Sequence, residues 1–258
     1  EGGAALLGNP GVIAMIAHHA ALYRDLADPV RLLRERPKDT MLARYWRYPV
    51  AADRGALQAD DVSRYSALMA ASQSFIAADI LDAYPFGRHK RLLDIGGGAG
   101  AFLIAALQRH RHLEGVLFDL PAVGDIARDA IARAAFSARV RIAGGDFYRD
   151  RLPEGCDAAT LVRVIHDHDD DKALSILKTA YAALRPSGVL ILAEPMAEAA
   201  GAKAMGNAYF GLYLLAMGSG RPRTAGELKA LLRAAGFRTA QIRKTRRPLL
   251  VSVLVAQV

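Results

Sequence analysis

The hydrophobic and polar positions divide the chain into a helical first part and a second part in which strands and helices alternate. Up to residue 88, the apolar residues recur at helical spacing. Helices are predicted over residues 9–26, from residue 28 onward, and from residue 60 or 61 to residue 85. We therefore predict a helical N-terminal unit (1–88) followed by an α/β domain (89–258).

Seven strands are predicted in the second unit. They cover residues 92–95, 115–118, 140–142, 160–165, 189–193, 238–244 and 249–256. The first five are separated by helical stretches, which is typical of a doubly wound, mostly parallel sheet. The last two are separated by a predicted tight turn at Pro248 and by no helix. We therefore expect these two strands to pair antiparallel.

Polar residues and glycines follow each of the first five predicted strands. They are Asp94 with Gly96, Gly98 and Gly100; Asp119 with Leu120; Gly144 to Asp146 with Phe147; His166, Asp167 and His168; and Glu194. In an open α/β sheet, ligands bind beyond the carboxyl ends of the strands. The sequence therefore predicts a binding site at this edge of the sheet.

The turn after the first strand has no side chains between Ile95 and Ala99, so its backbone can approach a ligand closely. Its spacing, Gly96-x-Gly98-x-Gly100, departs from the Gly-x-Gly-x-x-Gly of dinucleotide sites. Asp119 suits the hydroxyls of a ribose, and Asp146 beside Phe147 suits an adenine ring. The pattern favours a cofactor that contains adenosine and lacks a phosphate chain.

The segment from His166 to Asp171 allows a second interpretation, because two histidines among acids can bind a divalent ion. The acids Asp169 to Asp171, however, precede a helical stretch and suit cap and first-turn positions. We therefore predict no metal, and we expect His168 to stabilise its loop. His18 and His19 are given little functional weight, because adjacent residues do not share a helix face and a single histidine on a helix is usually a surface or core residue.

Composition narrows the class of protein. The 258 residues are 52% hydrophobic and 23% charged, as in a globular protein with a sizeable core. The lone Cys156 forms no internal disulfide and no secretory signal is visible, so we expect a cytoplasmic protein. A net charge of +8 suits nucleic acid, an anionic membrane or an acidic ligand. The one dense basic patch, Arg238–Arg247, contains no aromatic residues, so we predict no nucleic-acid binding.

Four motifs, in order and spacing, resemble the S-adenosylmethionine-dependent O-methyltransferases of the plant caffeic-acid type and their bacterial relatives. They are Leu92-Leu-Asp-Ile-Gly-Gly-Gly-Ala-Gly100, Phe118-Asp-Leu-Pro121, Gly145-Asp-Phe147 and His166-Asp-x-Asp-Asp170. Asn9-Pro-Gly11 and the stretches 65–73 and 209–224 resemble the bacterial hydroxyneurosporene (demethylspheroidene) O-methyltransferases of carotenoid biosynthesis. The resemblance implies a Rossmann-like methyltransferase fold with a seven-stranded, mostly parallel sheet, an antiparallel last strand and a partial helical N-terminal domain.

The resemblance also implies roles for individual residues. S-adenosylmethionine, converted to S-adenosylhomocysteine, would lie over Gly96, Gly98 and Gly100, with Asp94 nearby. Asp119 and the adjoining Leu120 would hold its ribose, Asp146 and Phe147 its adenine, and Arg163 would flank the adenine. His166 corresponds to the family's general base, and Glu194 to one of two acids that orient it. The second acid falls on Pro222, and Asp167 is expected to compensate.

Tyr209, Phe210, Tyr213 and Met217 form a stripe at helical spacing that suits either core packing or a pocket for a long apolar substrate. The implied reaction is methylation of a hydroxyl on a hydrophobic small molecule, a hydroxylated carotenoid by the closer resemblance. A polyketide, phenolic or tetrapyrrole-type acceptor is the alternative. An adenosine-nucleotide dehydrogenase is disfavoured by the glycine spacing, and a non-catalytic binding protein stays open because of Pro222.

The resemblance finally implies partners. The helical region of this family mediates homodimerisation, and the chain starts at Glu1 rather than Met, so the first part of that region is expected upstream. The basic patch at Arg238–Arg247 is predicted to contact an anionic membrane, such as the inner photosynthetic membrane that holds carotenoids.

Overall fold

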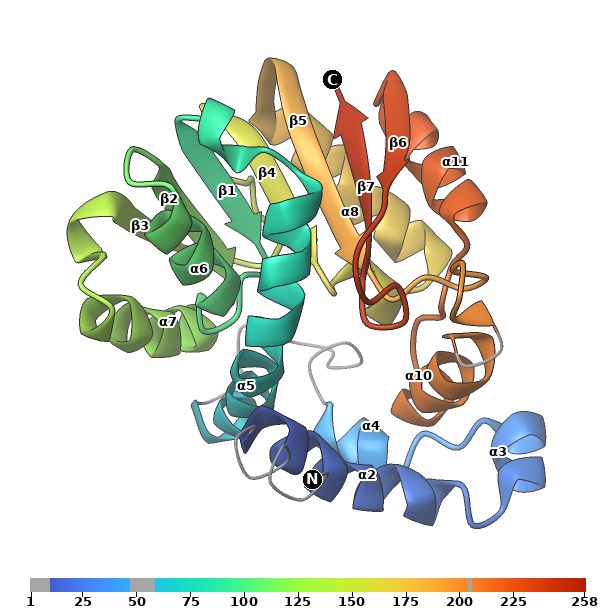
Figure 1. Ribbon diagram of the computed structural model, residues 1–258. Helices are drawn as coiled ribbons and strands as arrows, with labels where there is room; N and C mark the ends of the chain where they lie inside the picture. The colour runs from blue at the N-terminus through green and yellow to red at the C-terminus, as the bar shows by residue number, and fades with distance from the viewer. Residues whose placement is uncertain (1–9, 47–58, 204–205) are drawn as a thin grey trace.

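A central sheet organises the molecule, and the computed structural model describes residues 10–46, 59–203 and 206–258. The described residues form seven strands in the order β3-β2-β1-β4-β5-β7-β6 (Figure 1). They are β1 (Arg91–Ile95), β2 (Glu114–Asp119), β3 (Val140–Gly144), β4 (Cys156–Val162), β5 (Leu184–Glu194), β6 (Thr239–Arg243) and β7 (Ser252–Gln257). The first five are parallel, and β7 pairs antiparallel with both β5 and β6. The predicted fold class and the antiparallel pairing are confirmed.

Helices cover both faces of the sheet because successive strand residues point to opposite sides. On one face, α6 (Ala101–Arg109) and α7 (Pro121–Arg133) pack with Leu92 and Leu117. On the other, α8 (Asp170–Ala183) and α11 (Ala225–Ala235) pack with Leu93 and Leu190. Figure 1 shows the first pair in front of the sheet and the second pair behind it.

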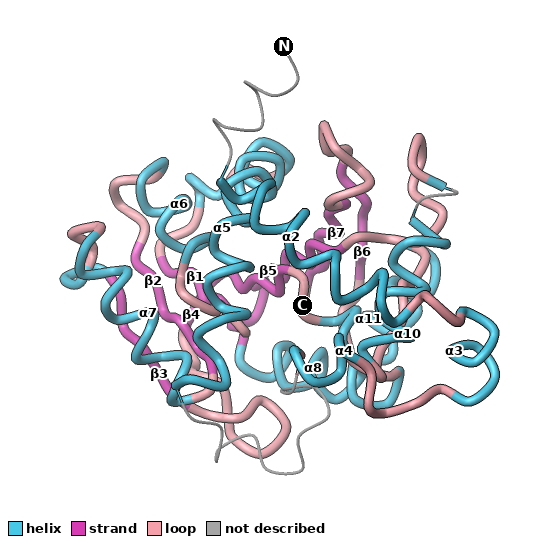
Figure 2. The backbone as a smooth tube through the Cα atoms, turned by 90° about the horizontal axis from the view of Figure 1, so that it is seen from below, coloured by secondary structure: helices cyan, strands magenta, loops and turns pink. Residues whose placement is uncertain are grey.

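A helical layer lies beyond the carboxyl ends of the parallel strands. It contains α2 (Pro10–Asp25), α3 (Pro29–Glu35), α4 (Met41–Tyr45), a π-helical turn (Gly206–Phe210) and α10 (Gly211–Met217). Leu22, Leu42 and Trp46 from the first part of the chain share one core with Leu214 and Met217. Seen from below, α2 and α5 lie across the sheet, with α4, α10 and α3 to one side (Figure 2). Residues 206–217, which carry no charged side chain, are thus part of this layer.

Helix α5 (Ala59–Ala83) joins the helical layer to the sheet. Its residue Leu68 packs in the helical layer, whereas Ile76 and Ile80 pack in the sheet core beside Phe102. The helix begins at Ala59, so the acids predicted to cap it, residues 60 and 61, lie in its first turn. The cap predicted for α3 is present, since Asp28 accepts a hydrogen bond from Arg31 N at 2.9 Å. The cap predicted at Asn9 falls outside the described residues.

Four predicted strand boundaries differ from the structure by three or more residues. Strands β4 and β5 start at Cys156 and Leu184, earlier than the predicted residues 160 and 189. The other two differences, at the end of β4 and the start of β7, have a local cause. Strand β4 ends at Val162 rather than continuing to residue 165, because Arg163 adopts a φ of +54° and the next two N–H groups bond to Glu194. The tight turn predicted at Pro248 is a longer loop between residues 243 and 252. Within it, the backbone N–H and the guanidinium of Arg247 bond to the buried carboxylate of Asp79 on α5.

Candidate functional site

A cavity of about 490 Å³ lies between the strand ends and the helical layer, within the usual size of small-molecule sites. The sheet side of its lining comes from the residues that follow the strands. They are Gly96 to Ala99, Asp119, Leu120, Gly145, Asp146, Phe147, Arg163, His166 and Asp167. The structure therefore brings together most of the site residues predicted from the sequence.

The glycine turn approaches the cavity with bare backbone. Gly96 and Gly98 have φ values of +68° and +56°, which favour glycine. A Cβ added to Gly98 would meet no described atom within 4 Å, so the space beside it is open. Gly100, the N-cap of α6, does not line the cavity, because a Cβ there would point at Leu117 and Ile131. Gly100 therefore serves the packing of the helix on the sheet.

Two acids lie around this turn. Asp119 lines the cavity and accepts hydrogen bonds from Gly98 N at 2.8 Å and Leu120 N at 2.7 Å. Burial raises the pKa of Asp119 to about 6. Asp94 lies beneath the turn, outside the cavity lining, where its Oδ1 accepts from Thr160 Oγ1 at 2.7 Å. Its Oδ2 has no hydrogen-bond partner among the described residues, and burial, with a smaller contribution from the charge of Asp119, raises its pKa to about 7.

The next two predicted residues stand side by side. Asp146 accepts from Tyr148 N at 3.0 Å, which orders the turn, and Phe147 contacts the rings of Tyr148 and His168 edge-on. Both Asp146 and Phe147 line the cavity. Arg163 also lines it, but its guanidinium donates to Gln73 Oε1 at 2.9 Å on α5. Arg163 therefore connects β4 to the helical layer as well as bordering the cavity.

His166 stands between two carboxylates. Its Nδ1 lies 2.5 Å from Glu194 Oε2, and its Nε2 lies 3.1 Å from Asp167 Oδ1. Glu194 is buried behind the histidine and outside the lining, whereas His166 and Asp167 line the cavity. Burial alone would lower the pKa of His166, but the charges of Asp167 and Glu194 outweigh it, so the pKa is raised above its ordinary value. The imidazole is therefore held with one nitrogen fixed and one near the cavity.

The helical side of the cavity is mostly apolar, and its polar members are His19, Ser72 and Gln73. The predicted stripe of Tyr209, Phe210, Tyr213 and Met217 lines it, together with Val12, Met15 and Ile76. Trp46 Nε1 donates to the hydroxyl of Tyr213 at 2.7 Å, and His18 Nε2 lies 2.7 Å from that hydroxyl. The hydroxyls of Tyr213 and Tyr209 are thus bonded within the protein, and the rings of both residues line the cavity.

The two histidines of α2 were not predicted from the sequence as site residues. His19 lines the cavity and its Nε2 lies 2.6 Å from the hydroxyl of Tyr209. Burial, helped by His19, lowers the pKa of His18 to about 4, so His18 is neutral beside Tyr213. Although adjacent on the helix, both histidines reach the same layer, because α10 and the turn before it pack along α2. Their partners are far away in the chain, so no local spacing could have identified them.

The metal interpretation finds no support at these residues. Among the residues that the structure describes, no three His, Cys, Asp or Glu side chains gather as metal ligands. His168 is buried and its Nδ1 lies 2.7 Å from the hydroxyl of Tyr148. Asp169 is at the N-cap position of α8, but its Oδ1 accepts from Gly220 N rather than from its own helix.

Within the described ranges, no helix has the length and apolar character that crossing a membrane requires.

Comparison with known proteins places this geometry in a family. A model of the O-methyltransferase domain matches residues 23–238. The chain belongs to the O-methyltransferase domain family. It is similar to demethylspheroidene O-methyltransferase of Rhodobacter capsulatus, with 41% identity over 99% of this chain, and to that of Cereibacter sphaeroides, with 40% identity over 98%. The chain spans 63% and 66% of the length of these two relatives.

A solved structure shares the fold. Human N-acetylserotonin methyltransferase in complex with SAM superposes with a TM-score of 0.78 over 95% of this chain and 69% of that one. The identity is 22%, so this likeness concerns the fold. The family resemblance drawn from the sequence motifs is confirmed.

Proposed function

We propose that this chain is an S-adenosylmethionine-dependent O-methyltransferase that methylates a hydroxyl of a hydrophobic small molecule, most suitably a hydroxylated carotenoid. One observation carries the proposal. His166 lies in the same cavity as the glycine turn and Asp119, with its Nδ1 2.5 Å from the buried Glu194. A held imidazole beside a nucleoside-type site is the arrangement that proton removal during group transfer requires.

The residues around the glycine turn fit the cofactor. The open space beside Gly98 accommodates a ligand against the backbone. Each carboxylate oxygen of Asp119 accepts one backbone hydrogen bond, which leaves acceptor capacity for ribose hydroxyls. Asp146 and Phe147 offer an acceptor and a ring face for adenine. The human structure of the same fold was solved with SAM, which supports the assignment. When bound, the cofactor supplies a methyl group already activated by its sulfonium.

His166 would then act as the base. Contact with Glu194 fixes a proton on Nδ1, so Nε2 is the nitrogen that accepts the hydroxyl proton of the acceptor. Asp167 Oδ1, at 3.1 Å from Nε2, stabilises the imidazolium that results. An aliphatic alcohol is a weak acid, so we expect the proton to leave as the methyl group is transferred rather than before. Alignment of the acceptor oxygen supplies the rest of the acceleration.

The substrate class is inferred from the helical side of the cavity and from the relatives. Ring faces and aliphatic side chains line most of that side, beside the polar His19, Ser72 and Gln73. The hydroxyls of Tyr209 and Tyr213 are bonded within the protein. Such a wall selects an apolar body that carries a hydroxyl at the end near His166. The two relatives at about 40% identity are named for demethylspheroidene, which favours a carotenoid over a polyketide, phenolic or tetrapyrrole-type acceptor.

The test is transfer of a labelled methyl group from S-adenosylmethionine to a panel of hydroxycarotenoids and to phenols of similar size, scored by product mass. The proposal expects an O-methylated carotenoid and weak or absent products from the phenols. Transfer to a phenol or polyketide alone would change the acceptor. No transfer to any hydroxyl compound, with the cofactor shown to bind, would contradict the proposed function.

Two partner proposals accompany the function. We propose a homodimer formed through the helical layer, supported by exposed apolar side chains on α2 and α3, namely Ile13, Ile16, Tyr23, Val30 and Leu33. Light scattering should give twice the chain mass, and a monomer at micromolar concentration would contradict it. We also propose contact between the basic patch Arg238–Arg247 and an anionic membrane, since Arg238, Arg243 and Lys244, in and beside strand β6, are exposed. Binding to anionic vesicles that Arg243→Glu leaves intact would contradict that contact.

A further inference from the structure

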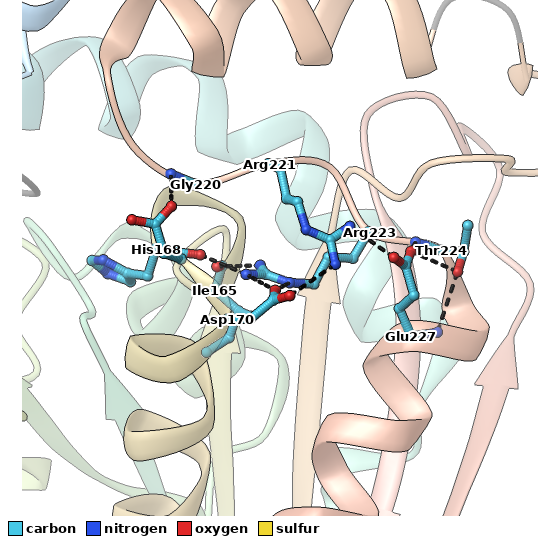
Figure 3. A network of polar contacts seen from close by, with 9 residues as sticks. Ile165, His168, Asp170, Gly220, Arg221, Arg223, Thr224 and Glu227 are labelled. Atoms are coloured by element: carbon cyan, nitrogen blue, oxygen red, sulfur yellow. Dashed lines mark hydrogen bonds and ion pairs between the residues drawn. The ribbon is translucent and has the colours of Figure 1, made fainter. Parts of the chain in front are cut away.

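The loop that carries His166 is held from two sides by buried groups of opposite charge. On one side, Glu194 accepts from Val164 N at 3.1 Å and Ile165 N at 2.7 Å, in addition to its contact with His166. On the other side, the guanidinium of Arg223 donates to the carbonyls of Ile165 and His168 (Figure 3). Two more carbonyls of the loop accept from the segment that precedes Arg223. The Glu194 carboxylate thus binds N–H groups of the loop, and the Arg223 guanidinium binds two of its carbonyls.

Four successive carbonyls of the loop receive these bonds. Ile165 O accepts from Arg223 Nη1 (2.9 Å), His166 O from Arg221 N (3.0 Å), Asp167 O from Ser219 Oγ (2.7 Å) and His168 O from Arg223 Nη2 (2.6 Å). The two carbonyls bound by Arg223 flank those of His166 and Asp167. The guanidinium therefore spans the part of the loop that carries the histidine.

Arg223 is buried, and both its side chain and its backbone are bonded to other parts of the protein. Its side chain is 1% exposed, and its charge is balanced by Asp170, whose Oδ1 lies 2.8 Å from Nε. Its own carbonyl accepts from Ala197 N at 2.9 Å, and the next residue, Thr224, forms a capping box with Glu227 at the start of α11. The backbone of Arg223 is thus fixed between the end of β5 and a helix. Pro222 stiffens the approach to it because its ring fixes φ.

The planar guanidinium matters because its donors are fixed in direction. One rigid group can set the orientation of two carbonyls at once, whereas a lysine presents a single flexible ammonium. The direction of the imidazole follows the backbone of its loop, and the contact with Glu194 alone allows the ring to pivot about Nδ1. The bonds from Arg223 fix the loop backbone, and with it the direction of the Cα–Cβ bond from which the ring reaches Glu194.

We propose that Arg223 is a positioning residue for His166, which holds the carbonyl side of the catalytic loop in place of the second acid that is absent at Pro222. The inference rests on the proposed function, because it concerns the orientation of the proposed base. It assigns Arg223 no contact with cofactor or acceptor, since Arg223 does not line the cavity.

The test compares Arg223→Met and Arg223→Lys with a matched control, Arg221→Met. The side chain of Arg221 shares Asp170 with Arg223 and also bonds Glu227, but it is 43% exposed and reaches no loop carbonyl in an identified bond. Its substitution keeps the backbone N–H that bonds to His166 O. Three quantities are measured for each protein: cofactor affinity by calorimetry, kcat for methyl transfer, and the titration of the His166 imidazole by NMR, with its signal assigned from His166→Gln.

For Arg223→Met we expect kcat to fall about 10- to 100-fold while cofactor affinity is unchanged, because a misplaced catalytic group costs rate rather than binding. His166 should titrate at a lower pH, as it moves away from Glu194 and Asp167. Arg223→Lys should recover part of kcat, and Arg221→Met should match the wild type. Should Arg223→Met fail to fold, Arg223→Lys carries the comparison.

Either of two results would overturn the positioning role: wild-type kcat in a folded Arg223 variant, or an unchanged titration of His166 in that variant. A wild-type protein that transfers no methyl group would defeat the proposed function instead. The NMR titration needs no acceptor, so it still decides whether Arg223 orients His166.

Discussion

Asp119 combines a cavity position with a pKa raised to about 6 by burial. Its ionised form is a strong acceptor of hydrogen bonds from ribose hydroxyls, and protonation weakens that acceptor, so cofactor affinity should fall as the pH drops through about 6. Between pH 7 and pH 5 we expect affinity for S-adenosylhomocysteine to weaken about tenfold, measured by calorimetry. Asp119→Asn should bind weakly and lack the step near pH 6. An affinity step that persists in Asp119→Asn would remove this role.

His166 sets the pH dependence of the reaction. Its pKa is raised because Asp167 and Glu194 outweigh the effect of burial, and a base works only in its neutral form. The rate should therefore fall as the pH drops through a value above 6.5. Glu194→Gln removes one of the two charges, so the acid limb of kcat against pH should move to lower pH and kcat should drop about 100-fold or more. An identical acid limb in Glu194→Gln would count against the pairing.

For single residues, the sequence predicted the site residues that follow strands, but it did not predict contacts between residues far apart in the chain. Asp119, Asp146, His166 and Glu194 come directly after apolar runs, so their position at the strand ends followed from the pattern. The bond from Arg163 to Gln73 joins elements far apart in the chain. The residues next to Arg163 in the sequence therefore could not predict its contact with α5.

At the scale of elements, the segment from residue 218 to 223 tests how tightly the catalytic loop is packed. A Cβ on Gly220, whose φ is +76°, would overlap the carbonyl oxygen of His166, whereas a Cβ on Gly218, with φ of +89°, meets no described atom within 4 Å. Gly218→Ala should cost about 1 kcal/mol in the free energy of unfolding, from backbone strain alone.

Gly220→Ala should cost about 2–4 kcal/mol, because overlap with the loop adds to the strain. Denaturant unfolding of both variants measures the difference, and methyl transfer should decline in Gly220→Ala alone. Equal unfolding free energies of the two variants would contradict the tight packing of Gly220 against the loop that carries His166.

Some strand boundaries could not be predicted from the local pattern of apolar and polar residues. The apolar runs of β1, β2 and β3 were found within two residues of their observed ends. The starts of β4 and β5, the end of β4 and the loop before β7 were not, and buried carboxylates determine the last two. Glu194 captures the N–H groups after β4, and Asp79 captures Arg247 before β7. Neither acid is near its partner in the chain.

At the scale of the molecule, the cavity exists because the sheet and the helical layer are held together. Helix α5 shares its core with both, and Asp79 on it accepts from Arg247 Nη2 at 2.9 Å. The predicted domain boundary at residue 88 separates α5 from the sheet, although α5 packs against the sheet core. The boundary stays a prediction.

The ion pair between Asp79 and Arg247 offers a matched comparison. Asp79 is buried, so Arg247→Met should leave its carboxylate without a charged partner and cost about 1–3 kcal/mol in unfolding free energy. The neighbouring Arg246 pairs with Asp82 at the surface, so Arg246→Met should leave stability unchanged. Thermal or denaturant unfolding measures both, and equal effects of the two changes would contradict the structural role of Asp79.

The central claim is that His166 removes the proton of an acceptor hydroxyl in a cavity that binds S-adenosylmethionine separately. The most direct measurement is methyl transfer by His166→Ala under saturating labelled cofactor, with cofactor affinity determined on the same preparation. We predict that transfer falls by about 10²–10⁴-fold while cofactor affinity stays at the wild-type value. Undiminished transfer, or a loss of cofactor binding that accounts for the lost transfer, would contradict the account.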